Sequence, residues 1–164
     1  MGILELIIPD RVERQLRERS RSIGVSVEEV ALEALCKGLG VTLDPAERAE
    51  VYLRTSETCF AEGEELLSEG KLANASEKLW GAAALMVKAV AAKRGMILRS
   101  HGSLHEFAVK LSLEQGDPSL RSLFAAASVL HQNLYESWLP EIAVRGYARD
   151  VRKLLEKLKS LIAG

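Results

Sequence analysis

The chain has 164 residues, of which 48% are hydrophobic, 27% charged and 5% aromatic, and its formal net charge is −1. This composition is typical of a folded globular protein and excludes a disordered chain or one with a strong overall basic charge. The two cysteines, Cys36 and Cys59, predict neither a disulfide framework nor a metal site. The longest apolar run, Leu79–Ala92, contains Lys88 and is too short to cross a bilayer. A cytoplasmic protein with no membrane association is therefore expected.

Residues 1–42 have the pattern of one strand followed by two helices. Residues 3–8 favour a strand, which Pro9 ends. Gly24 ends the first predicted helix, and the capping-box sequence Ser26-Val27-Glu28-Glu29 begins the second. This order predicts a ribbon-helix-helix-like arm.

The predicted strand has no second strand in the chain with which to pair. Its side chains alternate, with Leu4, Leu6 and Ile8 on one face and Ile3, Glu5 and Ile7 on the other. In ribbon-helix-helix units the strand pairs with the same strand of a second chain, and an unpaired strand edge is prone to association. A homodimer or a higher oligomer is therefore the expected state.

A DNA-binding regulator is an alternative function for this arm, because two-stranded ribbons of this class read the major groove. The second face of the strand, however, carries Glu5 and none of the Arg, Lys, Asn or Gln side chains that read base edges. Five arginines of the first predicted helix remain available for phosphate contacts: Arg11, Arg14, Arg17, Arg19 and Arg21.

Residues 43–164 are predicted to form a bundle of four or five helices, which makes the fold all-α. Asp44-Pro45-Ala46-Glu47 is a strong helix start, and the run Leu79–Ala92 marks a central helix that is buried nearly all round. The expected helices are 45–69, 71–94, 103–115, one opened by Asp117-Pro118 and broken by Pro140, and 141–162.

Three histidines are candidates for polar chemistry. His101 and His105 have a zinc-like spacing, but the predicted cap at Ser103 leaves His101 outside the helix, and no metal site or catalytic residue is assigned. His131 interrupts an apolar helical stripe, which fits either a structural core histidine or a polar ligand site. The predicted site contains His101 and His131, with Lys78, Glu77, Tyr135 and Glu136 as neighbours.

Several runs together resemble the archaeal PaREP family, over nearly the whole chain. They are Gly24-Val25-Ser26-Val27-Glu28-Glu29, Asp44-Pro45-Ala46-Glu47-Arg48-Ala49-Glu50, Ala75-Ser76-Glu77-Lys78-Leu79-Trp80-Gly81-Ala82-Ala83, Ser100-His101-Gly102 and Leu130-His131-Gln132-Asn133-Leu134-Tyr135-Glu136. The resemblance adds Asn133 to the candidate site. It also implies a helical bundle akin to the HEPN proteins, which pair with nucleotidyltransferases or act as RNases in toxin–antitoxin systems.

The resulting hypothesis is a non-enzymatic, HEPN-like oligomeric protein that mediates interactions or binds a nucleotide, with no cofactor. The resemblance makes nucleotide, RNA or a nucleotidyltransferase-type protein the expected partner. A toxin–antitoxin-type RNase, or its regulator, is the alternative. HEPN RNases carry an Arg followed four to six residues later by His; here Arg99 precedes His105 by six residues, but a turn and a predicted helix cap lie between them.

Overall fold

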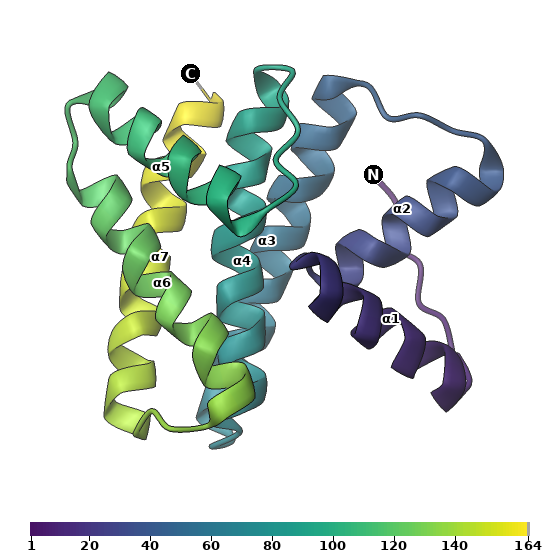
Figure 1. Ribbon diagram of the computed structural model, residues 1–164, viewed down its shortest axis with the longest axis horizontal. Helices are drawn as coiled ribbons and strands as arrows, with labels where there is room; N and C mark the ends of the chain where they lie inside the picture. Colours follow the sequence, from purple (N-terminus) through teal and green to yellow (C-terminus); the bar gives the residue numbers. More distant parts are fainter. Residues whose placement is uncertain (164) are drawn as a thin grey trace.

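The computed structural model describes residues 1–163, and the regular secondary structure in this part of the chain is all α-helix. The helices are α1 (Asp10–Ile23), α2 (Val27–Leu39), α3 (Pro45–Ser68), α4 (Leu72–Lys93), α5 (His101–Gln115), α6 (Ser119–Glu136) and α7 (Glu141–Ala163). Helices α3 to α7 form the bundle, and residues 1–42, with α1 and α2, form the arm, which projects from one side of α3 and α4 (Figure 1). The predicted all-α class and helical bundle are confirmed.

Helix starts follow the capping residues read from the sequence. The Ser26 side chain accepts a hydrogen bond from the Glu29 backbone N–H at 3.1 Å at the start of α2. At α3, the Asp44 side chain accepts from the Glu47 N–H, and the Glu47 side chain accepts from the Asp44 N–H. These bonds satisfy N–H groups that the first turn of a helix leaves unpaired.

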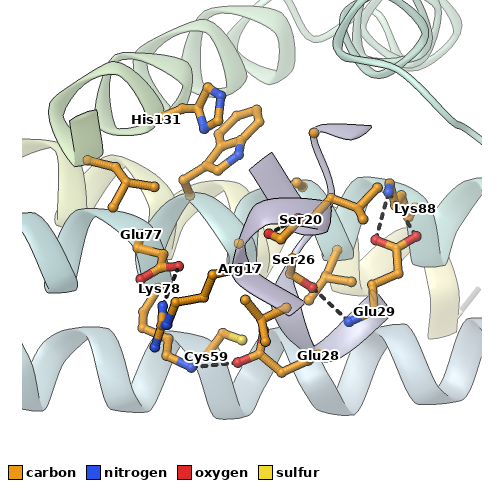
Figure 2. A pocket seen from close by; sticks show the side chains of 18 of the residues that line it. Arg17, Ser20, Ser26, Glu28, Glu29, Cys59, Glu77, Lys78, Lys88 and His131 are labelled. Atoms are coloured by element: carbon orange, nitrogen blue, oxygen red, sulfur yellow. Dashed lines mark hydrogen bonds and ion pairs between the residues drawn. The ribbon is translucent and has the colours of Figure 1, made fainter. Parts of the chain in front are cut away.

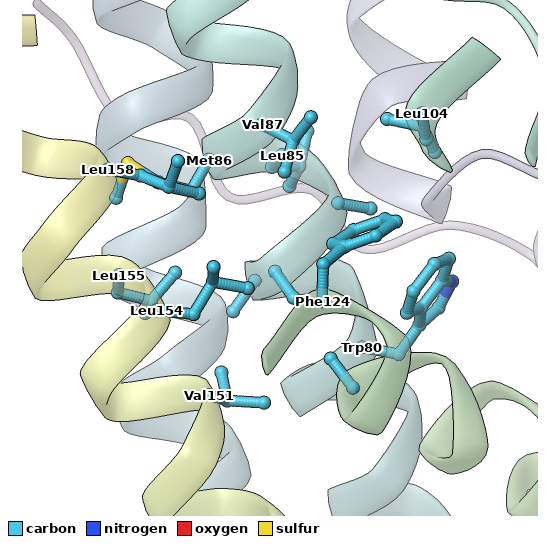
Figure 3. Packing of buried hydrophobic residues seen from close by; sticks show 14 of the residues in the cluster. Trp80, Leu85, Met86, Val87, Leu104, Phe124, Val151, Leu154, Leu155 and Leu158 are labelled. Atoms are coloured by element: carbon cyan, nitrogen blue, oxygen red, sulfur yellow. The ribbon is translucent and has the colours of Figure 1, made fainter. Parts of the chain in front are cut away.

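Helix α4 is the centre of the bundle, as its apolar sequence predicts. Every residue from Leu79 to Ala92 is buried, and α3, α6 and α7 surround the helix (Figure 1). Figure 3 shows Phe124 of α6 and Leu154 and Leu158 of α7 within this core, all three at most 1% exposed. Burying each such side chain contributes about 1.5–3 kcal/mol.

Helices α3 and α4 approach closely because Gly63 has no side chain. A Cβ atom at Gly63 would lie 2.9 Å from Leu79 Cγ. Seven residues earlier on α3, the buried Ser56 hydroxyl donates to the Ala82 carbonyl of α4 at 2.6 Å. The two helices are therefore held together by both shape and a hydrogen bond.

The predicted strand at residues 3–8 is wrong for the single chain. Residues 1–9 have no regular secondary structure, and no strand occurs in residues 1–163. A strand needs a neighbouring strand to pair its backbone N–H and C=O groups. The arm observed within one chain is helix–helix, preceded by a segment without such a neighbour.

The apolar faces of the arm are left uncovered. Helix α1 has no buried residue, and α2 has only Val30. In the segment before α1, Ile3 and Ile7 are 94% and 105% exposed, whereas Leu4 and Leu6 are 69% and 63% exposed. The arm therefore exposes a run of large apolar side chains, and exposed apolar surface that forms a patch marks an interaction site.

Two helix boundaries differ from the prediction. Helix α5 begins at His101 rather than 103, because Ser100 and Ser103 cap it reciprocally through backbone N–H groups, 3.1 Å in each direction. Helix α6 ends at Glu136, followed by Ser137 with a left-handed φ of 49°. Trp138, expected on the apolar face of that helix, lies beyond it and is 54% exposed.

Candidate functional site

Four aromatic rings from three helices meet beside the arm. We call Trp80, His101, His131 and Tyr135 the ring cluster. The His101 and His131 ring centroids are 4.6 Å apart, and the Trp80 ring lies 5.6 Å and 5.2 Å from them. The Tyr135 ring meets His131 edge-on at 5.3 Å. The rings of His101 and His131, which were predicted to share a site, therefore lie next to each other, because α5 begins early enough to carry His101 inward.

Burial favours the neutral form of both histidines. Removal from water lowers the pKa of His101, and the nearby His105 and Lys88 add to this effect. Burial also lowers the pKa of His131, and the charge that His101 would carry lowers it further. Within residues 1–163 the buried Nδ1 of His131 has no hydrogen-bond partner. A neutral imidazole with an unpartnered nitrogen can accept or donate one further hydrogen bond.

The turn between α1 and α2 closes over the ring cluster. Gly24 ends α1 with a left-handed φ of 69°, and a Cβ atom there would lie 2.7 Å from His101 Nε2. Glycine is needed at this position both for its backbone conformation and for the close approach. On the same side, the Arg21 guanidinium stands 5.1 Å from the centroid of the Tyr135 ring.

A cavity of about 110 Å³ lies beneath this turn, between the arm and the bundle. Figure 2 shows its charged side chains. Lys78 of α4 contacts Glu28 of the arm at 2.5 Å and Glu62 of α3 at 2.9 Å, and Arg17 of α1 contacts Glu77 at 3.5 Å. Although burial opposes it, hydrogen bonding to the two carboxylates raises the pKa of Lys78. These pairs orient the arm, but partly exposed pairs of this kind contribute only about 0–1 kcal/mol each.

A third arm-to-bundle ion pair is buried. Lys88 Nζ of α4 donates to both carboxylate oxygens of Glu29, at 2.9 Å and 2.7 Å (Figure 2). The two side chains are only 4% and 14% exposed. The Tyr52 hydroxyl of α3 also donates to Glu29, at 3.3 Å, and burial together with the Glu29 charge raises the pKa of Tyr52. Glu29 thus joins three helices.

One side chain in the wall of this cavity is chemically inert in the docked arrangement. Cys59 of α3 is 1% exposed, and burial raises the pKa of its thiol to about 12. A protonated, covered thiol is a poor nucleophile. No group of three His, Cys, Asp or Glu side chains in residues 1–163 could hold a metal ion.

The structure brings together five of the seven predicted site residues. Glu77, Lys78, His131 and Tyr135 line the cavity, and the His101 ring packs at a tilt of 41° against the His131 ring. Asn133 lies elsewhere: it is buried, its amide donates to Ser76 Oγ at 2.9 Å, and its oxygen accepts from the Leu139 N–H at 2.8 Å. Glu136 is exposed and does not line the cavity.

Sequence reasoning missed the contribution of the arm to this site. Gly24, Glu28 and Glu29 were read only as helix ends and caps, yet all three line the cavity. One signal was present in the sequence: Lys88 is the single charged residue of the run Leu79–Ala92. A buried lysine needs a carboxylate partner, and that partner is Glu29.

The RNase alternative would bring an arginine and a histidine together. His105 packs edge-on against Phe124, with ring centroids 4.8 Å apart. Arg99 instead borders a second cavity, which His105 does not line. Neither residue lines the cavity beneath the arm turn.

Comparison with known proteins identifies the family. The model of the archaeal PaREP1/PaREP8 family matches residues 51–155, and the chain belongs to this family. The chain is also similar to a protein from Sulfolobus solfataricus whose crystal structure is known: the TM-score is 0.60 and the identity 24%, over 66% of this chain and 96% of that one. That likeness supports the bundle fold. No curated protein matches the chain, and no helix within residues 1–163 is long and apolar enough to span a membrane.

Proposed function

We propose that this protein is a non-enzymatic, self-associating protein that pairs through its N-terminal arm in a ribbon-helix-helix-like arrangement. The observation that carries the proposal is the uncovered apolar surface of the arm, from Ile3 through α1 and α2. Burying apolar surface is the main driving force for protein association. A second copy of the same arm supplies a matching surface through a two-fold axis.

The segment before α1 supports pairing of this kind. No backbone hydrogen bond joins residues 3–8 to the rest of the described chain. An antiparallel ribbon between two copies would satisfy these groups. Leu4 and Leu6, the less exposed side chains, would then face the four helices of the paired arms, and Ile3 and Ile7 would face outward.

Light scattering tests the proposal on four proteins. The full-length chain is expected to be a dimer or a higher oligomer, and a chain that starts at Leu43 is expected to be a monomer. Leu6→Asp, in the arm, should also give a monomer, whereas Ile142→Asp, an equally apolar and exposed position on α7, should leave the oligomer intact. A monomeric full-length protein overturns the proposal, as does an oligomer that survives loss of the arm.

A second function, binding of a nucleotide or RNA, is favoured by the ring cluster. Bases stack on aromatic side chains, with about 1–3 kcal/mol per base. Tyr135 is the exposed ring of the cluster, at 45%, and it lies beside His131, whose Nδ1 is an unpartnered polar atom next to Trp80. The chain has two tryptophans, so Trp138→Phe makes Trp80 the only tryptophan fluorophore. Titration of this variant with AMP and with a short RNA is expected to quench the Trp80 fluorescence.

Two further variants separate a binding histidine from a structural one. If His131 binds the ligand, His131→Gln loses the quenching and keeps its melting temperature. If His131 is structural, His131→Gln and His131→Ala lower the melting temperature with no separate binding defect. Absence of quenching by both AMP and RNA in the Trp138→Phe protein excludes this second function.

A further inference from the structure

A second and larger cavity separates the arm from the bundle on another face. Its volume is about 520 Å³, and it is bounded by α1, α2, the connection between α2 and α3, the α3 helix and the connection between α4 and α5. Pockets that bind small molecules have volumes of about 300–1,000 Å³. This cavity is therefore large enough for a small organic ligand.

Four cationic side chains from four different segments border this cavity. They are Arg19 of α1, Lys37 of α2, Arg48 of α3 and Arg99 of the α4–α5 connection. None of the four forms an ion pair with a carboxylate of residues 1–163. In contrast, the cations beside the smaller cavity, Arg17, Lys78 and Lys88, are all paired.

The carboxylates of the cavity do not balance these cations. Glu29 is one of two carboxylates in the lining, and Lys88 already holds it from the bundle side. Glu33 is the other. The cavity thus carries an excess of positive charge, which would attract an anion and concentrate it there.

The remaining wall is largely apolar. Ile23, Leu32 and Leu98 come from the arm and from the α4–α5 connection, and the Tyr52 and Thr42 side chains add hydroxyl groups. Apolar walls lower the local dielectric constant, which strengthens the attraction between a cation and a bound anion. Guanidinium groups bind carboxylate and phosphate oxygens with two parallel hydrogen bonds.

We propose that this cavity is a binding site for a small organic anion that has an apolar body and a carboxylate or phosphate monoester head. The head would lie against Arg48, Arg99 and Lys37, and the body against Leu32 and Leu98. Because the walls come from both the arm and the bundle, an occupant would also hold the arm in its docked position.

Isothermal titration calorimetry of the full-length chain tests this with four probes: hexyl phosphate, hexanoate, 1-hexanol and inorganic phosphate. The two organic anions should bind saturably and tighter than hexanol, which lacks the charge, and tighter than inorganic phosphate, which lacks the apolar body. The comparison of hexyl phosphate with hexanoate identifies the preferred head group.

Matched variants locate the binding. Lys37→Gln/Arg99→Gln should weaken the binding of the tighter-binding organic anion by about tenfold or more. A tenfold change in affinity corresponds to about 1.4 kcal/mol. Arg121→Gln/Lys153→Gln removes the same two charge types from exposed positions on α6 and α7 and should leave binding unchanged. Both double variants alter exposed residues, so their melting temperatures are expected to match the wild type.

Three outcomes overturn the proposal. Neither organic anion binds the wild-type chain; or hexanol binds as tightly as the anions, which removes the role of charge; or the two double variants lose affinity equally, which makes the attraction a property of net charge rather than of this cavity.

Discussion

At the residue scale, Lys88 is the one charged side chain among the fully buried residues of 1–163. Its ammonium group is tolerated inside the protein because Glu29 accepts two hydrogen bonds from it. Removing one partner of such a pair leaves a charge that is buried and uncompensated. Replacing both partners can leave the stability of the protein nearly unchanged. The pair therefore couples the docking of the arm to the stability of α4.

We expect Glu29→Gln to lower the free energy of unfolding by about 3 kcal/mol, because it leaves the Lys88 charge unpaired. Urea denaturation followed by circular dichroism measures this change. The control is Arg54→Gln, which breaks an exposed pair with Glu50 and should change stability by at most about 0.5 kcal/mol.

The double variant Glu29→Gln/Lys88→Met completes the cycle. It should recover most of the stability lost in Glu29→Gln, because no unpaired charge remains in the core. If the stability loss of the double variant equals the sum of the losses in Glu29→Gln and Lys88→Met, the two side chains act independently.

The neutral histidines make stability depend on pH. Burial lowers the pKa of His101 and of His131 below the ordinary 6.5, so the unfolded chain takes up protons at a higher pH than the folded chain. Stability is therefore expected to fall as the pH drops below 6.5, until the folded-state pKa values are passed. Urea unfolding between about pH 7.5 and pH 5 measures the slope.

The control for this slope is His131→Gln, which cannot take up a proton at this position. Its stability should vary less with pH over the same interval than that of the wild type. An equal slope in the variant would assign the pH dependence to other groups.

At the element scale, the contact of α3 with α4 depends on the missing side chain of Gly63. Alanine normally stabilises a helix interior relative to glycine by about 0.5–1 kcal/mol. At Gly63 the added methyl group would lie 2.9 Å from Leu79 Cγ. We therefore expect Gly63→Ala to destabilise the protein by about 1–3 kcal/mol, the range for overpacking a core.

Gly81 offers a matched comparison on α4. It is also a buried helical glycine, but a Cβ there would meet no atom within 4 Å. Gly81→Ala should raise the melting temperature, while Gly63→Ala should lower it. If both variants shift the melting temperature in the same direction, helix propensity rather than helix spacing governs these positions.

Helices were predictable from the sequence where local chemistry defines their ends. Ser26, Asp44 and Pro45 predicted the starts of α2 and α3, because capping bonds join residues three apart. The start of α5 was missed, because Ser103 reads equally well as a cap and as the partner of the Ser100 cap. The strand predicted over residues 3–8 is absent from the single chain, because a strand depends on a neighbour that local sequence does not supply.

At the scale of the whole molecule, association through the arm would couple stability to protein concentration. If the oligomer is the stable form, dilution shifts the equilibrium toward chains with an uncovered arm. The melting temperature of the full-length chain should therefore fall over about a hundredfold dilution, as measured by scanning fluorimetry. A chain that begins at Leu43 should melt at the same temperature at every concentration, and a full-length chain that did so as well would contradict association.

The candidate site was predictable only in its bundle half. His131 could be recognised from periodicity, because it interrupts an apolar helical stripe, and Lys78 from its place at the entry of the most buried helix. The turn between α1 and α2 that covers the site could not be predicted, because the contact between Gly24 and His101 joins residues far apart in the chain. Asn133 shows the reverse limit: the family resemblance added it to the candidate site, but its hydrogen bonds to Ser76 and Leu139 serve the packing of α6.

The position of Cys59 makes the opening rate of the arm measurable. The chain has two free thiols, and Cys36 on α2 is half-buried, whereas Cys59 lies covered beneath the arm with a pKa of about 12. An alkylating reagent should label Cys36 promptly and reach Cys59 only while the arm is lifted, when water restores an ordinary thiol pKa. The labelling rate of Cys59, measured by mass spectrometry, would then report how often the arm opens. Glu29→Gln, which removes the buried ion pair with Lys88, should increase the labelling rate of Cys59.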